Sequence, residues 1–196
     1  MLVALYHGDH KKDGLMARLG YWSIRFGQLG EEYSQYTHCE VIFAGDRDKV
    51  RMGSASFRDG KQVRITEAEL NRDHWTILYV PVDDPLVVEA WFLDHLGKPY
   101  SMIGAMSSAS LLIRVLLFVL YIEADELDQW CSRSLGLSFG LRGADDMSVS
   151  ELAAALWNIK GTRDVTNEFF DPESVFPPTL TLTPLEFSAA GIAPQT

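Results

Sequence analysis

Hydrophobic and polar positions alternate along the first half of the chain in the manner of β-strands. Gly45–Asp46 and Arg58–Asp59–Gly60 are turn-forming residues that separate the middle runs from one another. The pattern predicts a central sheet of about five strands, with three antiparallel strands between residues 36 and 65. The apolar runs expected to form strands are 2–7, 36–44, 50–57, 63–65 and 75–82.

Apolar residues at helical spacing predict two helices in the same half of the chain. The first covers residues 14–26. The second begins at Asp84–Pro85, because proline is favoured in the first helical turn, and it ends before Gly97. The residues of this second helix that are expected to face the core are Val88, Trp91, Phe92 and His95.

Two capping boxes and one long apolar run predict the remaining helical segments. Thr66–Glu69 has the spacing of a capping box for a short helical turn, and Ser148–Glu151 has the same spacing at the start of a helix. The run 109–122 is shorter than the roughly 20 residues that a membrane span needs, and Arg114 lies in its middle. We therefore expect a buried or partly exposed helix of the core there.

The length and the order of these elements indicate one α+β domain. A chain of 196 residues, 47% of them hydrophobic, is long enough for one sizeable core. Strands dominate its first half and helices its second half, which is the α+β arrangement. Residues 1–170 are expected to form this domain. The segment 171–196 holds five of the eight prolines, which excludes a long helix and indicates an extended arm.

The charge and the N-terminus bear on partners and location. Seventeen basic residues against 27 acidic ones give a net charge of −10, so we expect no nucleic-acid partner and no membrane partner. The N-terminal apolar run precedes its charges, which is not the order of a secretion signal. The expected location is the cytoplasm, or a phage or other particle if the chain leaves the cell by lysis or assembly.

Few residues suit a metal or disulfide site. Cys39 and Cys131 are too few for a disulfide scaffold and form no CxxC pair. The acidic run 123–128 lacks the glycine and the spacing of a calcium loop, and His74 and His95 are expected to be structural. A solvated turn is the expected setting of His7, Asp9, His10 and Asp13. Neither a metal nor an organic cofactor is expected.

The strand YTHCEVIF carries the first candidate for catalysis. Because side chains alternate along a strand, His38 and Glu40 share one face and Cys39 lies on the other. A carboxylate two residues from an imidazole can bind one ring nitrogen and leave the other free as a base. Cys39 is therefore interpreted as a packing residue.

The second candidate is Cys131, in the segment WCSRSLG. Its context predicts the first turn of a helix. The positive end of the helix dipole and the free backbone N–H groups there lower the pKa of a thiol and can receive an oxyanion. An ordinary buried cysteine is the alternative interpretation.

These segments together resemble a known family. Five segments follow one another in the order found in circularly permuted papain-fold amidases. They are a short strand, the helix LMARLGYWSIRFG, the strand YTHCEVIF, the tetrapeptide GKPY and the segment WCSRSLG. The resemblance is to the YiiX-like branch of the NlpC-like cell-wall peptidase superfamily, and it covers roughly residues 2–155. It implies a permuted papain-like fold, in which an antiparallel sheet packs against helices.

The resemblance also implies roles for individual residues. Cys131 would be the nucleophile, His38 the general base and then the acid, and Glu40 the group that orients the imidazole. Ser54 and Ser56 on the next strand are the alternatives to Glu40. The residues expected to contact substrate are Tyr100, Trp130 and Ser132, and Arg133 stands where relatives tend to have an acidic residue.

The expected function is therefore that of a cysteine hydrolase, a thiol protease or amidase that cleaves an amide bond in peptides such as those of bacterial cell walls. One alternative is a lipid-directed acyltransferase or thioesterase of the same fold, because lecithin-retinol-acyltransferase-like proteins share the permuted plan and because residues 109–122 are strongly apolar. Another is a non-catalytic binding or structural module that has lost turnover.

Overall fold

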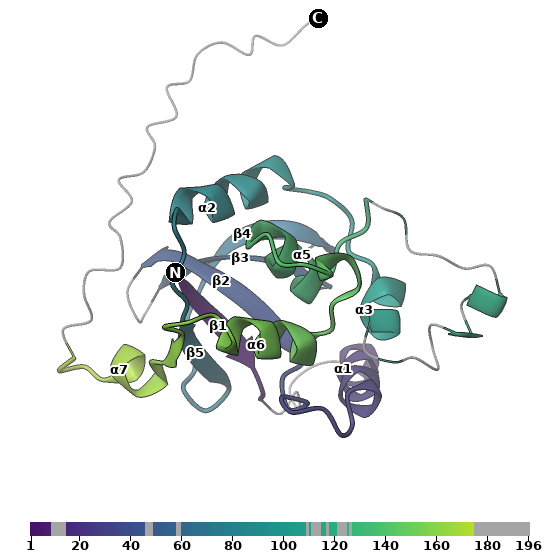
Figure 1. Cartoon of the computed structure of the whole chain (residues 1–196), viewed down its shortest axis with the longest axis horizontal. Helices are drawn as coiled ribbons and strands as arrows, with labels where there is room; N and C mark the ends of the chain where they lie inside the picture. The colour runs from purple at the N-terminus through teal and green to yellow at the C-terminus, as the bar shows by residue number, and fades with distance from the viewer. Residues whose placement is uncertain are drawn as a thin grey trace, which may run out of the picture.

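A six-stranded antiparallel sheet lies at the centre of the molecule (Figure 1). Its strands follow the order β4-β3-β2-β1-β5-β6. The computed structural model describes residues 1–8, 15–45, 49–57, 60–108, 110, 115–116, 118–120, 125 and 127–174. The strands are β1 (Leu2–Tyr6), β2 (His38–Gly45), β3 (Val50–Ser56), β4 (Gln62–Ala68), β5 (Trp75–Tyr79) and β6 (Arg163–Asp164).

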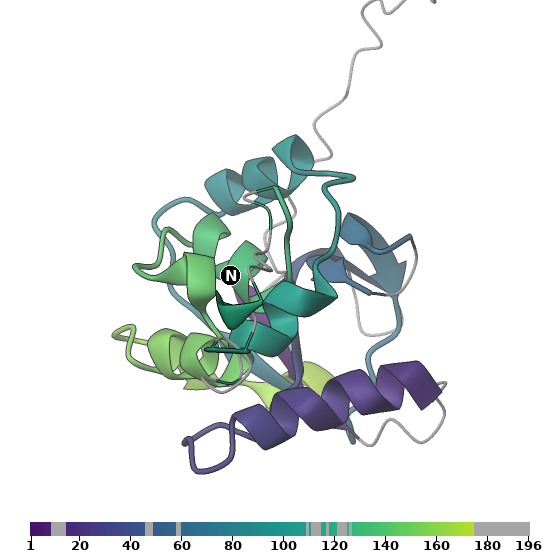
Figure 2. The same cartoon turned by 90° about the vertical axis from the view of Figure 1, so that its right-hand side faces the viewer.

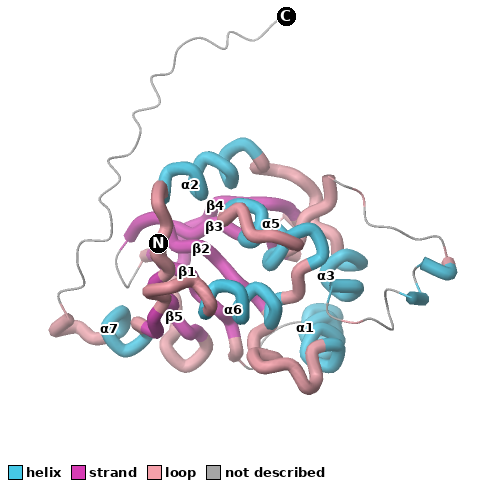
Figure 3. Tube along the Cα trace, in the orientation of Figure 1, coloured by secondary structure: helices cyan, strands magenta, loops and turns pink. Residues whose placement is uncertain are grey.

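Helices cover both faces of this sheet, which confirms the predicted α+β class (Figures 1 and 3). Helices α2, α5 and α6 pack on one face, α7 packs on the other, and α1 lies beside α3 (Figure 2). The helices are α1 (Leu15–Gly27), α2 (Pro85–Asp94), α3 (Met102–Ser108), α5 (Cys131–Ser138), α6 (Val149–Trp157) and α7 (Thr166–Phe170), with a 3₁₀ turn at Ala144–Asp146.

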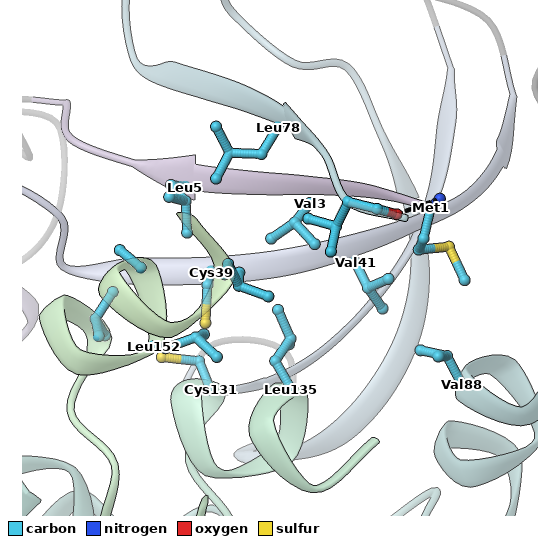
Figure 4. Packing of buried hydrophobic residues seen from close by; sticks show 14 of the residues in the cluster. Met1, Val3, Leu5, Cys39, Val41, Leu78, Val88, Cys131, Leu135 and Leu152 are labelled. Atoms are coloured by element: carbon cyan, nitrogen blue, oxygen red, sulfur yellow. Dashed lines mark hydrogen bonds between the residues drawn. The ribbon is translucent and has the colours of Figure 1, made fainter. Parts of the chain in front are cut away.

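Alternation along the central strands divides the core into two clusters. Val3 and Val41 point to the face covered by α5, where they pack near Leu135 (Figure 4). Leu2 and Ile42 point to the opposite face and join the cluster that contains Phe169 of α7. Both faces of the central strands are therefore buried, which fixes their register.

The predicted strands are present, and β4 is longer than predicted. Thr66 lies in β4 and pairs with Met52 of β3. The predicted capping box Thr66–Glu69 is therefore wrong, because pairing with β3 extends the strand to Ala68. Conversely, β5 ends at Tyr79, three residues before the predicted end.

Helix α2 begins as its sequence predicts. The side chain of Asp84 accepts a hydrogen bond of 2.9 Å from the backbone N–H of Leu86, and Pro85 follows the cap. Val88 and Phe92 are buried, as expected, whereas Trp91 and His95 are half-buried and their rings stack with centroids 3.9 Å apart.

The capping box at Ser148–Glu151 is also confirmed, since both of its reciprocal hydrogen bonds are present. The sequence pattern missed α3, β6 and α7. β6 has only two residues, which is too short for an alternation signal.

The apolar run 109–122 is described only in part. Residues 115–116 and 118–119 are helical, and the side chains described between 115 and 120 are 52–74% exposed, so these residues do not pack in the core as expected. Among the described residues, no helix combines the length and the apolar character needed to cross a bilayer. The expected arm at 171–196 lies outside the described residues from 175 onward.

Candidate active site

Cys131 is the first residue of α5, as its sequence context predicts. Trp130 precedes it in an extended conformation, with φ −135° and ψ 167°, and occupies the N-cap position. The first backbone N–H groups of an α-helix have no acceptor within the helix. The Cys131 thiol therefore lies beside N–H donors and the positive end of the helix dipole, both of which favour a thiolate.

His38 is the first residue of β2, and it pairs across the sheet with Tyr6 of β1. The Nε2 atom of its ring lies 3.0 Å from Oε1 of Glu40, which confirms that these two side chains share a face of the strand. Because Nε2 is engaged by Glu40, Nδ1 is the ring nitrogen left for another group.

Glu40 is buried within a row of polar side chains that crosses three strands. Its Oε1 atom accepts hydrogen bonds from Ser54 Oγ at 3.2 Å and from Arg64 at 3.4 Å. Burial would raise the pKa of Glu40, but the hydrogen bond and charge of His38, followed by Arg64, lower it overall. Glu40 is thus an ionised partner for His38.

Ser54 and Ser56, the alternative third residues, are both buried on β3. Ser54 binds Glu40, so it supports the carboxylate that holds His38. Arg64, which supplies a positive charge to the same carboxylate, was missed by the sequence reasoning. Arg64 lies on β4 and pairs with Ser54 of β3, and this register is the signal that places it beside Glu40.

Cys131 and His38 perturb one another's protonation. Burial alone would lower the pKa of His38, but the charge of the Cys131 thiolate and the hydrogen bond to it, with a further contribution from Glu40, raise it to about 9. A hydrogen bond from Cys39 and the charge of His38, acting against burial, hold the pKa of Cys131 well below its usual range. The arrangement favours a thiolate–imidazolium pair.

Cys39 is more than the packing residue predicted from its position. It is fully buried, lies on the face of β2 that contacts α5, and has its sulfur directed toward Cys131 (Figure 4). Burial raises the pKa of Cys39, and so do the hydrogen bond to Cys131 and its negative charge. Cys39 therefore remains a neutral thiol that donates to the thiolate of Cys131.

Tyr100 also lies within electrostatic reach of Cys131. Burial, followed by the negative charge of Cys131, raises the pKa of Tyr100 well above its usual range. An isolated bridge pairs Tyr100 with Gln129, two residues before the nucleophile candidate. The residue expected to line the site thus lies near the segment that precedes Cys131, as a neutral phenol.

Trp130 and Ser132 flank Cys131 and are both buried. The indole Nε1 of Trp130 and the hydroxyl of Ser132 each donate to the carbonyl oxygen of Met147, at 3.2 Å and 2.6 Å. These bonds fix the start of α5 against the segment before α6. A role for the two residues in binding substrate stays a prediction.

Arg133, which stands where relatives tend to have an acidic residue, folds back onto the protein. Its guanidinium lies 5.1 Å from the ring centroid of Trp130 and donates to the carbonyl oxygen of Asp128 at 3.1 Å. Its side chain is 12% exposed. Arg133 therefore supports the loop before α5.

Of the other described histidines, His7 follows β1 and His74 precedes β5, and the backbone N–H of His7 donates to the carbonyl oxygen of His74 at 3.0 Å. His95 is the C-cap residue of α2. Among the described residues, no group of three or more histidine, cysteine, aspartate or glutamate side chains is arranged to hold a metal ion. The expected solvated turn at residues 9–13 lies outside the described residues.

Comparison of the chain with protein-family models, with curated proteins and with solved structures gives no match. The function must therefore be argued from the geometry of Cys131, His38 and Glu40.

Proposed function

We propose that the protein is a cysteine hydrolase of permuted papain-like architecture that cleaves an amide bond. The observation that carries this proposal is the position of Cys131 at the start of α5, beside an imidazole that Glu40 holds through Nε2. An activated thiol, a base in reach of it and a third group that orients the base are the components of nucleophilic acyl transfer.

The first half of the reaction is acylation. The Cys131 thiolate attacks the carbonyl carbon of the substrate, and the carbonyl oxygen becomes an oxyanion that the backbone N–H groups at the start of α5 stabilise. The intermediate then expels the amine. His38, as imidazolium, donates its proton to this leaving nitrogen, so that a thioester on Cys131, a free amine and a neutral His38 remain.

The second half is hydrolysis of the thioester. Neutral His38 accepts a proton from a water molecule while the oxygen of that water attacks the thioester carbon. The carbon–sulfur bond breaks, the acid product leaves, and Cys131 returns to the thiolate beside a protonated His38. The ionised Glu40 stabilises the imidazolium at both stages.

The substrate class follows from the family resemblance, which favours a peptide or isopeptide amide of the kind found in bacterial cell walls. An acyl ester or thioester of a lipid is the second candidate. Exposed Phe118 and its apolar neighbours favour this second candidate, because a water-exposed apolar segment suits a lipid substrate.

The proposal is tested first without any choice of substrate. The rate of iodoacetamide alkylation is measured against pH on the folded protein, and each cysteine is quantified by peptide mass spectrometry. We expect Cys131 to react with an apparent pKa far below the usual value of roughly 8.5 and buried Cys39 to be protected. A slow Cys131 with an ordinary pKa would make the protein a non-catalytic module.

A second experiment identifies the reaction. The protein is mixed with p-nitrophenyl acyl esters and with cell-wall peptides, and the acyl-enzyme is sought by intact mass. We expect an adduct on Cys131 that Cys131→Ala abolishes. His38→Ala should slow its formation about 100-fold or more, whereas the control His95→Gln on α2 should not. Equal effects of the two histidine variants would contradict the assigned roles.

A further inference from the structure

Large apolar side chains are exposed mainly on one side of the molecule. Trp22 and Phe26 of α1 are 73% and 63% exposed, and Ile103 on the neighbouring α3 is 42% exposed. Figure 2 shows α1 and α3 on the face turned to the viewer. The coloured helical piece that contains Phe118, which is 74% exposed, extends from the same side in Figure 1.

This concentration is unusual for a protein surface. The structure describes several large apolar side chains that are more than half exposed. Most of them lie on α1, just after it at Leu29, or between residues 115 and 120. The exceptions are Val87 and Leu127. Single exposed apolar residues are normal, whereas a group of them marks a contact site. We call α1 together with residues 115–116 and 118–120 the apolar face.

The charge of α1 differs in sign from that of the whole chain, so the expectation of no membrane partner, which rests on the net charge, does not hold for this helix. The helix carries Arg18 and Arg25 and no carboxylate, in a chain with a net charge of −10. Arg18, Trp22 and Arg25 follow the spacing i, i+4, i+7, so they share one side of the helix, and all three are exposed. Ile24, on the other side, is buried.

An aromatic stripe bordered by arginines fits the surface of a lipid bilayer. Tryptophan and phenylalanine insert at the level of the headgroups, and arginine reaches the anionic phosphates while its aliphatic part stays in contact with apolar groups. A second copy of the chain fits less well. A two-fold contact of α1 with α1 would bring Arg18 and Arg25 against their own counterparts.

We propose that the apolar face docks the protein on the surface of a membrane that contains anionic lipid. Helix α3 connects the face to the candidate site, because α3 contacts α1 and a Cβ on its Gly104 would lie 2.4 Å from the ring of Trp130, the residue before Cys131. Docking goes beyond the proposed hydrolysis and does not depend on it, so it is measured with the inactive Cys131→Ala variant of the full chain.

The experiment is co-sedimentation with large unilamellar vesicles. One set contains phosphatidylcholine alone and the other contains phosphatidylcholine mixed with phosphatidylglycerol. We expect binding to the mixed vesicles to be at least about tenfold stronger. Phe26→Glu should weaken it about tenfold or more, and the double change Arg18→Gln with Arg25→Gln should remove the preference for phosphatidylglycerol.

The control is Val87→Glu, which places the same charge on an equally exposed aliphatic position of α2. This variant should bind like the parent. The proposal is overturned if neither kind of vesicle is bound, or if Phe26→Glu and Val87→Glu bind equally well. It is also overturned if light scattering shows a dimer that Phe26→Glu dissociates, since a second copy would then cover the face.

Discussion

His38 Nε2 and Glu40 Oε1 are 3.0 Å apart, on side chains that leave the same face of one strand two residues from each other. The strand is paired on both sides, by β1 and by β3, so the backbone of both residues is held by the sheet. The carboxylate is itself held by Ser54 and Arg64. The imidazolium ring thus has a fixed orientation before any substrate binds.

Replacement of Glu40 by glutamine tests this relationship. The variant Glu40→Gln keeps the size of the side chain and loses its charge, so the pKa of His38 should fall below its value of about 9. We expect kcat/KM to fall about 100-fold and the alkaline limb of its pH profile to move to lower pH. The measurement is the pH profile of hydrolysis of a peptide amide substrate.

The matched control for that variant is Glu89→Gln. Glu89 forms an ion pair with Arg51 on a different part of the sheet, so its loss should leave the pH profile unchanged. If the pH profiles of Glu40→Gln and Glu89→Gln coincide, Glu40 has only a structural role and does not set the pKa of His38.

The pH dependence of hydrolysis should differ from that of alkylation. Amide hydrolysis needs the Cys131 thiolate and the His38 imidazolium together, so its rate should rise as the thiol deprotonates and fall as pH passes about 9. Alkylation needs only the thiolate, and it should not fall above pH 9. Parallel decline of both rates above pH 9 would contradict the assignment of the upper pKa to His38.

Cys39 should tune the nucleophile. Cys39→Ala removes the hydrogen bond to the Cys131 sulfur, so the apparent pKa of Cys131 should rise. Cys39→Ser keeps a hydroxyl donor and should remain close to the parent, both in pKa and in activity. The measurement is iodoacetamide alkylation of Cys131 against pH in the two variants. If the alanine and serine variants give the same pKa for Cys131, the hydrogen bond from Cys39 does not lower that pKa.

Gly104 should be intolerant of a side chain. A Cβ at this position would lie 2.4 Å from the Trp130 ring, so Gly104→Ala should destabilise the fold by about 1–3 kcal/mol and slow the alkylation of Cys131. Urea unfolding and alkylation measure the two effects. The double variant with Trp130→Leu provides the control, because it removes the ring that the new methyl group meets. If the double variant is no more stable than Gly104→Ala, the contact with Trp130 is not the cause of the destabilisation.

The sheet could largely be predicted from the sequence because strand alternation is a local signal. The strands β1 to β3 follow from it with ends that differ by one or two residues. The C-terminal end of β4 could not be predicted in this way. A local capping pattern at Thr66 competes there with pairing to Met52, and the pairing partner is a property of the fold.

The same distinction applies to the candidate site. The pairing of His38 with Glu40 follows from alternation within one strand, and the place of Cys131 follows from its helix context. The contact between Cys39 and Cys131 depends on which face of the sheet α5 covers. The position of Arg64 beside Glu40 depends on the register of β3 and β4. Neither property is encoded in a single segment.

The two halves of the candidate site come from distant parts of the chain. His38 and Glu40 belong to β2, whereas Cys131 begins α5, after β5, α2 and α3. During synthesis the N-terminal strands leave the ribosome well before Cys131 does. His38 and Glu40 are thus synthesised before Cys131, and in an unfolded or half-made chain the thiol of Cys131 has the ordinary pKa of a free cysteine. The reactive thiolate arises only in the folded protein, which limits unwanted acylation or oxidation of the nascent chain.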